Sequence, residues 1–164
     1  MDTKTIKIAV ISDLHVMAPQ LLLSEGAPFE EYLTRDRKML RESAEILDTL
    51  VNEITDAQPQ LVLVTGDLTK DGERVSHQLV ARQLQRLVDH GIQGLVVPGN
   101  HDINNPDAKV FDGDAVPPAE TITRSEFATI YRNMGYDDCS RHDADSLSYC
   151  RDVAPGLTVL AIDA

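Results

Sequence analysis

The residues best suited to chemistry are residues 99–102, Gly-Asn-His-Asp, which follow the apolar run 95–97 and Pro98. An apolar run that stops at a Pro-Gly pair is typical of a buried strand that ends in a tight turn. The turn offers an amide oxygen, an imidazole and a carboxylate within four residues. These groups suit metal binding and proton transfer, although so short a motif fits a polar surface turn equally well.

Two further stretches place polar side chains directly after an apolar run. Asp13 and His15 follow the run 6–11, and Asp67 follows the run 61–64. In an open α/β sheet, ligands bind outside the carboxyl ends of the strands. Three polar turns in equivalent positions therefore predict one shared site at that edge, which a single polar turn would not.

The three motifs in this order, Asp-x-His, Gly-Asp and Gly-Asn-His-Asp, resemble those of the calcineurin-like metallophosphoesterases. They extend from Asp13 to Asp102 and so span most of the chain. Residues 66–72, Gly-Asp-Leu-Thr-Lys-Asp-Gly, are most similar to the bacterial branch that includes cyclic-nucleotide phosphodiesterases. The resemblance implies a phosphohydrolase that cleaves phosphodiesters or phosphomonoesters with a hydroxide activated by two divalent metal ions.

The resemblance implies that four side chains bind the metal ions, namely Asp13, His15, Asp67 and Asn100. Asp13 and His15 are two residues apart, so an extended backbone would point both side chains toward the same ion. Asp67 is the natural bridge between the two ions, and Asn100 offers a neutral oxygen to the second. Oxygen and imidazole ligands suit Mn, Fe, Zn or Co alike, so the metal is not identified.

The same resemblance implies catalytic roles for His101 and Asp102. His101 is expected either to donate a proton to the scissile ester or to hold the phosphoryl oxygens. Asp102 is expected to orient the His101 imidazole and to raise its basicity. For Asp71 two interpretations stay open, a turn through Gly72 or a hydrogen bond near the site, and the turn is favoured.

The elements expected to position these residues form a βαβαβ unit. Apolar runs predict parallel strands at residues 6–12, 61–65 and 93–97, the first of them central and buried on both faces. Helical periodicity predicts crossover helices at about residues 34–57 and 72–90. Right-handed crossovers give a parallel first sheet, and the resemblance implies an α/β fold, the layered metallophosphoesterase-type αββα sandwich.

Two long connections, residues 16–34 and 103–119, leave directly from the motifs. They contain proline and glycine, and we expect them to be irregular walls of the substrate pocket. The three leucines at residues 21–23 are equally compatible with pinning the first loop to the body of the domain. Further along, Thr123 is expected to cap a helix over residues 124–134.

Two apolar segments near the end of the sequence, residues 146–150 and 157–162, predict paired strands that begin a second sheet. The sequence stops within the second of them. Related phosphoesterases add histidines after this point, and His142, the one histidine that follows His101 here, resembles none of them. We therefore expect residues 1–164 to be the truncated N-terminal part of a single domain, weakly active or inactive by itself.

The composition narrows the class of partner. The net charge of −12 disfavours nucleic acid, whose binders present basic surfaces. A small phosphate ester stays compatible because bound metal ions reverse the charge locally. No apolar run approaches the roughly 18 residues of a transmembrane segment. Residues 1–4 lack the apolar core of a signal peptide, which fits a cytoplasmic protein and equally an exported one whose signal has been removed.

Two alternatives to a hydrolase stay open. A chain of this fold that lacks metal ligands can serve as a non-catalytic interaction module, and a nuclease of the same superfamily is a further option. Bound metal with turnover would support the hydrolase, and the absence of both would support the module. Strong salt-dependent binding of DNA would support the nuclease. The sequence names neither the substrate nor an oligomeric state.

Overall fold

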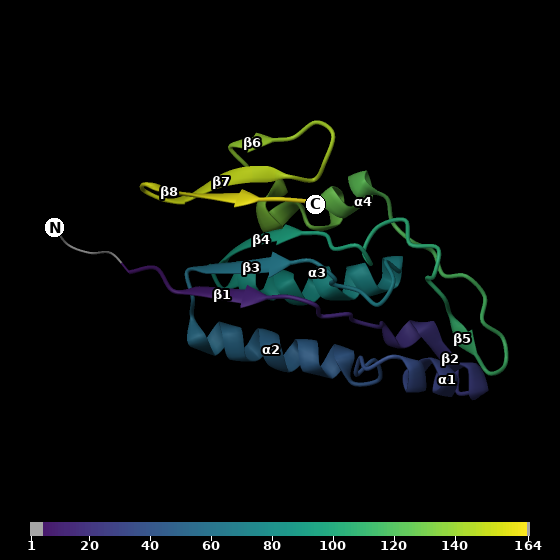
Figure 1. Cartoon of the computed structure of the whole chain (residues 1–164). Coiled ribbons are helices and arrows are strands. Elements are labelled where there is room, and N and C mark those ends of the chain that lie inside the picture. The colour runs from purple at the N-terminus through teal and green to yellow at the C-terminus, as the bar shows by residue number, and fades with distance from the viewer. Residues whose placement is uncertain (1–4, 164) are drawn as a thin grey trace.

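The computed structural model describes residues 5–163 and is shown in Figure 1. Residues 1–4, where we expected no signal peptide, and Ala164 lie outside the described residues. Within the described part, no helix combines the length and the apolar character needed to cross a membrane.

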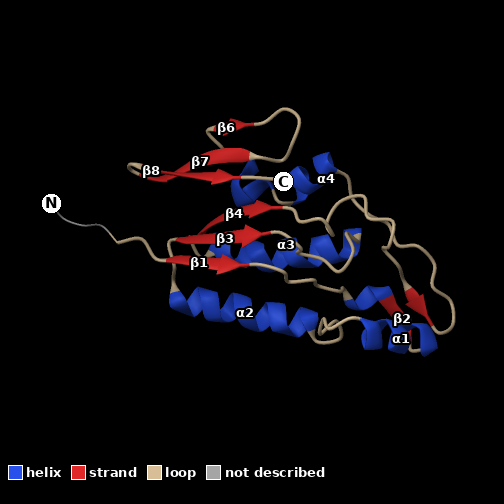
Figure 2. Cartoon of the chain, in the orientation of Figure 1, coloured by secondary structure: helices blue, strands red, loops and turns tan. Residues whose placement is uncertain are grey.

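A parallel three-stranded sheet forms the centre of the fold (Figure 2). Its strands, in the order β1-β3-β4, are β1 (Ile8–Ile11), β3 (Leu61–Thr65) and β4 (Gln93–Val97). Helix α2 (Ser43–Ala57) precedes β3, and helix α3 (Arg74–Asp89) precedes β4. The predicted parallel βαβαβ sheet is confirmed, and each strand ends where a motif begins.

Apolar residues on the two faces of this sheet belong to two different cores. Val62 and Val64 pack with the helices α2 and α3 in the main core, whose helical members include Leu47 and Leu84. The opposite face packs against a second sheet, where Leu61 and Leu95 meet Tyr149. Helices, first sheet and second sheet therefore form successive layers, and the predicted layered α/β fold is confirmed.

Strand β1 differs from the prediction of a central strand buried on both faces. It pairs with β3 alone and so forms one edge of the described sheet. Ile8 is 43% exposed and Val10 is 66% exposed. The physical reason is that the second sheet contacts the first through β4 and leaves the outward face of β1 open to solvent.

The two long connections were expected to be irregular, but both contain regular structure. They also pair with each other through one short strand from each. The first holds the 3-10 turn η1 (Pro19–Leu21), strand β2 (Leu22–Ser24) and helix α1 (Ala27–Arg35). The second holds strand β5 (Phe111–Asp112), which pairs with β2 in parallel. We call residues 16–42 and 103–121 together the small lobe.

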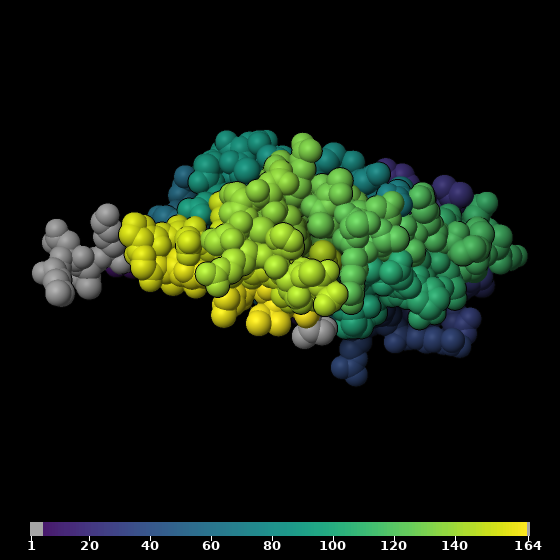
Figure 3. All heavy atoms as spheres, turned by 90° about the horizontal axis from the view of Figure 1, so that it is seen from above, coloured from purple at the N-terminus to yellow at the C-terminus, as the bar shows by residue number. Residues whose placement is uncertain are grey.

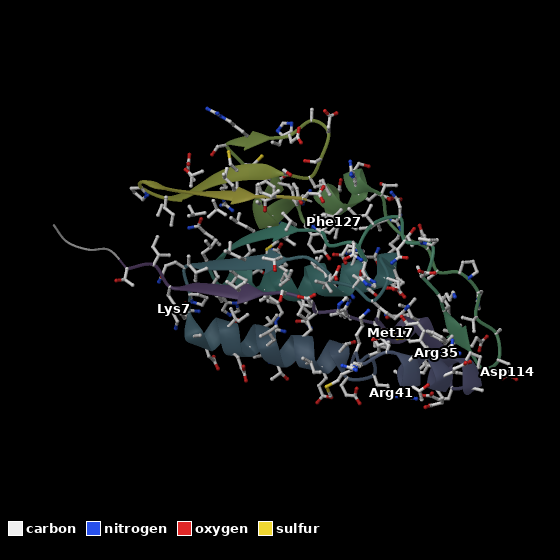
Figure 4. All side chains as sticks on the ribbon, viewed as in Figure 1. Lys7, Met17, Arg35, Arg41, Asp114 and Phe127 are labelled. Carbon is white, nitrogen blue, oxygen red and sulfur yellow. The ribbon has the colours of Figure 1, made fainter. Side chains whose placement is uncertain are left out.

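The small lobe has an apolar core of its own, formed by six buried residues: Met17, Ala18, Leu21, Phe29, Leu40 and Phe111. In Figure 1 the lobe, labelled α1, β2 and β5, stands beyond the arrowheads of β1, β3 and β4. In Figure 4, Met17 lies between the sheet and α1, and Asp114 lies at the outer tip of the lobe. The lobe therefore stands at the carboxyl edge of the sheet, where the motifs lie.

The helix predicted at about residues 34–57 is α2, which begins later than expected. Helix α1 ends at Arg35, and α2 begins only at Ser43. Between them the carboxylate of Asp36 accepts the backbone N–H of Lys38 at 3.1 Å, a local bond that competes with helix formation. The end predicted at residue 57 is confirmed, and Leu47, Val51 and Ile54 form the buried face of α2.

The last third of the chain adds a helix and the second sheet. Thr123 caps α4 (Arg124–Ile130) through a reciprocal capping box with Glu126, as its position predicted. The helix ends earlier than residue 134 and continues as the π-helical turn η2 (Arg132–Tyr136), in which Gly135 has a left-handed backbone.

The second sheet has three antiparallel strands, in the order β6 (Arg141–His142), β7 (Tyr149–Ala154) and β8 (Leu157–Ala161). The predicted pairing of two strands is confirmed, although β7 begins three residues later than expected. Seen from above in Figure 3, the lime and yellow residues of this sheet fill the left and centre, and the green lobe residues extend to the right.

Candidate metal centre

The turns that follow β1, β3 and β4 are in direct contact. The N–H of Asp13 donates to the carbonyl oxygen of Gly66 at 3.2 Å. A Cβ atom placed on Gly66 would lie 2.7 Å from the backbone nitrogen of Gly99, so only glycine permits this approach. The three motifs therefore meet at the carboxyl edge of the sheet, as their positions after the strands predicted.

Three non-glycine residues in these turns have left-handed backbones. The φ angles are 54° at Asp13, 44° at His15 and 50° at Asp67. Such a conformation costs of order 1–2 kcal/mol for an ordinary residue and persists only where the surroundings enforce it. The prediction that Asp13 and His15 share one side of an extended segment is therefore wrong, because the chain leaves the extended conformation after Ile11.

A cluster of possible metal ligands lies where the turns meet. His15, Asp67 and His101 each offer one ligand atom, and these atoms all lie within 4.8 Å of one another. The Nε2 atom of His15 is 3.7 Å from Oδ2 of Asp67. The rings of His15 and His101 stand edge to face with centroids 5.0 Å apart. Three groups from three different turns thus converge on one point.

The two remaining ligand candidates lie in the same turns as this group. Asp13 is exposed, two residues before His15. Asn100 is also exposed and directly precedes His101. The structure therefore brings His15 and Asp67 together with His101, and it places Asp13 and Asn100 beside them on the solvent side.

The chemistry of the donor set fits a divalent metal ion. The Nδ1 atom of His15 is buried and has no hydrogen-bond partner of normal geometry among the described residues. Burial, followed by the charge of Lys38, lowers the pKa of His15 below its ordinary value. The imidazole is therefore neutral at pH 7, which is the form that binds metals.

Asp67 is held between the other two members of the cluster. Its Oδ1 atom accepts the backbone N–H of His101 at 3.2 Å, and its Oδ2 atom faces His15. A Cβ atom on Gly99 would lie 2.1 Å from Oδ1 of Asp67. Gly99 therefore leaves the space in which the Asp67 carboxylate sits.

The contact expected between Asp102 and the His101 ring is made by Asp71 instead. Oδ1 of Asp71 lies 3.2 Å from Nδ1 of His101, which must donate because a carboxylate only accepts. Asp71 is almost fully buried. Of its two open interpretations, the hydrogen bond near the site is the one that the structure bears out. Its position within the same glycine-bounded loop as Asp67 is the sequence signal for it.

The carboxylate of Asp102 ties the turns together. It accepts the backbone N–H groups of Leu68, Thr69 and Gly99 at 2.8–3.1 Å, and also the hydroxyl of Thr69 at 2.9 Å. Asp102 is completely buried. These four donors occupy the carboxylate fully, so Asp102 positions the turn that carries His101 and does not touch the imidazole.

His77 on α3 is buried beneath the turns. Its Nε2 atom lies 2.8 Å from the carbonyl oxygen of Asp102, and its Nδ1 atom lies 2.9 Å from the hydroxyl of Tyr131. Burial lowers the pKa of His77 below its ordinary value. The residue therefore supports the turn from below as a neutral packing histidine.

Comparison with known proteins gives two findings. Residues 6–152 match the calcineurin-like phosphoesterase family. The chain is also 28% identical, over 134 residues, to a protein named 3′,5′-cyclic-nucleotide phosphodiesterase from Nostoc sp.. That alignment covers 82% of this chain and 45% of the relative, so the chain spans about half the length of the protein it matches. The family match includes all three motif turns, and the chain belongs to the calcineurin-like phosphoesterase family.

Proposed function

We propose that this chain contributes the catalytic centre of a metal-dependent phosphohydrolase that cleaves small phosphate esters. The observation that carries the proposal is the convergence of His15, Asp67 and His101 at the contact of the three motif turns. Backbone strain at His15 and Asp67 supports it, because strained residues gather at functional sites.

The proposed ligands for two divalent ions are Asp13, His15, Asp67 and Asn100. When bound, such ions supply Lewis acidity, an activated water and charge compensation for the phosphoryl oxygens. Asp67 is the proposed bridge because its two oxygens face different neighbours within the cluster. The exposed positions of Asp13 and Asn100 leave their oxygens free to turn toward an ion.

His101 is the proposed proton donor to the leaving oxygen, or the clamp on the phosphoryl oxygens. Its Nδ1 atom is occupied by Asp71, so Nε2 is the atom left to meet the substrate. Asp71 holds the ring in one orientation through this contact. Asp102 contributes by holding the backbone turn on which His101 sits.

A small phosphate ester is the proposed substrate class. The phosphodiesterase from Nostoc sp. is named for 3′,5′-cyclic nucleotides, so these esters are the first candidates. The net charge of −12 repels long polyanions, whereas bound metal ions would compensate the charge of a single phosphate group.

The test compares His101→Ala with the wild-type chain in the presence of Mn²⁺. A proton donor that is not a ligand leaves the metal content nearly unchanged, while turnover falls by about 10²–10⁴-fold. Hydrolysis of an alkyl ester should suffer more than hydrolysis of a nitrophenyl ester, because nitrophenolate leaves without protonation. His142→Ala, at an exposed position on β6, is the matched control.

Each other outcome has a defined meaning. Equal losses for both esters would favour the clamp over the proton donor. Loss of a metal ion in His101→Ala would make His101 a ligand. If wild-type protein neither binds Mn²⁺ nor hydrolyses bis(p-nitrophenyl) phosphate, the proposed activity is wrong for this chain, and a non-catalytic interaction module becomes the better description.

A further inference from the structure

Lys70 carries a buried charge that the proposed mechanism does not use. It lies in the loop between Asp67 and α3, and its side chain is 0% exposed. An unpaired ammonium in such a place would cost several kcal/mol. Here the carboxylates of Asp71 and Glu73 both pair with it, the second at 3.0 Å. Lys70 is thus a charged side chain held in place from two sides.

The small lobe provides the remaining surroundings of Lys70. Its Nζ atom lies 4.9 Å from the ring centroid of Tyr32 and 5.9 Å from that of Phe111. Tyr32 belongs to α1 and Phe111 to β5, and their rings meet edge to face at 5.6 Å. Both halves of the lobe therefore contact the ammonium, and cation–π attraction favours this arrangement.

A chain of contacts leads from the lobe to His101. The hydroxyl of Tyr32 donates to Oδ2 of Asp71 at 3.2 Å, and Lys70 contacts the same oxygen. The other oxygen of Asp71 meets Nδ1 of His101 at 3.2 Å. Burial and the charge of Asp71 raise the pKa of Tyr32 well above its ordinary value, so the hydroxyl stays a donor.

The carboxylate of Asp71 is planar and rigid, so the groups that hold one oxygen also set the direction of the other. Tyr32 and Lys70 hold Oδ2, while Oδ1 faces the imidazole. A second bond, from the backbone N–H of Asp71 to Glu73 at 3.2 Å, fixes the main chain of the same residue. Asp71 therefore has little freedom to rotate away from His101.

We propose that Lys70 and Tyr32 are positioning residues, through which the small lobe sets the orientation and the tautomer of the His101 imidazole by way of Asp71. Only the catalytic consequence of this positioning rests on the proposed function, in which His101 acts on the ester. The orientation itself exists without metal or substrate and is measured without turnover.

The competing explanation is that Lys70 merely neutralises Asp71 and Glu73 and attaches the lobe. Tyr32→Phe separates the two explanations because it keeps the ring against Lys70 and removes only the bond to Asp71. Tyr136→Phe is the matched control, since its hydroxyl is buried and has no partner among the described residues. Lys70→Met removes the ammonium with a side chain of similar length.

The experiment is ¹H–¹⁵N NMR of the histidine side chains in the ¹⁵N-labelled chain, with EDTA present, at about pH 8, where an ordinary imidazole is neutral. In the wild-type protein we expect the Nδ1-protonated tautomer of His101 to predominate over a small Nε2-protonated population, because Asp71 accepts the Nδ1 proton. Tyr32→Phe and Lys70→Met should each raise the population of the Nε2-protonated tautomer at least about threefold. A decrease of less than 1 kcal/mol in the free-energy preference for the Nδ1-protonated tautomer is enough to produce this change. Tyr136→Phe should leave it unchanged.

Identical His101 spectra in the wild type, Tyr32→Phe and Lys70→Met, with folding verified by circular dichroism, would overturn the proposal. If Lys70→Met does not fold, Tyr32→Phe decides alone. In the Mn²⁺-loaded protein the same variants should keep their metal content and KM while kcat falls about tenfold. Absence of turnover in the wild type would count against the proposed function only, since the NMR result stands without it.

Discussion

The carboxyl edge of the first sheet and the second sheet β6-β7-β8 are built in different ways. At the edge, three non-glycine residues, Asp13, His15 and Asp67, have left-handed backbones. Among described residues 137–163, no non-glycine residue does so. The polar contacts of the edge are buried, as at Asp102, whereas those of the second sheet are largely exposed, as at Asp152.

The difference shows where the fold holds strain and what holds it there. Each left-handed residue costs free energy that must be offset by buried contacts around it. Those contacts are the bonds of Asp102 to three backbone N–H groups and the close approach of Gly66 to Gly99. We therefore expect substitutions at the edge to be far more damaging than equivalent substitutions in the second sheet.

The largest effect is expected for Asp102→Ala compared with Asp152→Ala. Removal of the Asp102 carboxylate leaves the N–H groups of Leu68, Thr69 and Gly99 without their acceptor. Unpaired buried amides cost roughly 1–3 kcal/mol each, so the free energy of unfolding should fall by about 3–5 kcal/mol. Urea unfolding followed by circular dichroism measures the loss.

Asp152 provides the matched control for that measurement. Its carboxylate accepts the hydroxyls of Ser140 and Thr158 at the protein surface, where water replaces them on mutation. Asp152→Ala should therefore shift the urea midpoint only slightly. Equal midpoints for the two variants would remove the contrast between the two regions.

A smaller effect, directed at the site, is expected for Gly99→Ala compared with Gly156→Ala. A Cβ atom on Gly99 would lie 2.1 Å from Oδ1 of Asp67 and must displace that carboxylate. Affinity for Mn²⁺ should then fall at least about tenfold, as for other changes that misplace a ligand. Titration of each variant with Mn²⁺ measures the change.

Gly156, in the turn between β7 and β8, has a φ of +79° and open space around it. Alanine there should cost about 1–2 kcal/mol of stability from backbone strain alone. The affinity for Mn²⁺ should stay that of the wild type. A similar loss of Mn²⁺ affinity in both glycine variants would mean that strain spreads through the whole fold.

The smallest effect is a pH dependence that originates at the edge. Burial lowers the pKa of His77 from the ordinary value of 6.5, so the unfolded chain binds a proton more readily than the folded one. The free energy of unfolding should therefore decrease as the pH falls below about 6.5. Above that value the neutral His77 should make its full contribution to stability. His15, whose pKa is also lowered, contributes with the same sign.

Urea unfolding between pH 7.5 and pH 5.5 checks this pH dependence. In His77→Gln the slope of the free energy of unfolding against pH should be shallower than in the wild type. His142→Gln, in the exposed strand β6, controls for the number of histidines. A steeper slope in His77→Gln would show that the sign assigned to this histidine is wrong.

The parallel sheet and the meeting of the motifs follow from local sequence. Each apolar run is bounded by a turn, and parallel neighbours bring their carboxyl ends to one edge. Residues 61–65 and 93–97 were therefore placed correctly, and so were the turns at Asp67 and His101. The edge position of β1 was not predictable in the same way, because an apolar run does not reveal which strands lie beside it.

The small lobe and the partner of His101 depend on contacts that sequence spacing does not encode. Leu22 pairs with Phe111, 89 residues further along, and neither segment forms regular structure by its own periodicity. Asp71 and Asp102 are both aspartates close to motif residues. Only the fold shows that backbone amides occupy Asp102 and leave Asp71 to contact the imidazole.

The central claim, that the motif turns form one metal centre with Asp67 at its middle, is tested most directly by titrating the chain and Asp67→Asn with Mn²⁺. The amide keeps the shape of the side chain and an acceptor for the N–H of His101, but it loses the charge. Asp48→Asn, on the surface of α2, controls for the change in net charge.

We expect the wild type and Asp48→Asn to bind Mn²⁺ alike, and Asp67→Asn to bind at least about tenfold more weakly with its fold intact. Equal affinity in all three proteins would contradict a metal centre built around Asp67.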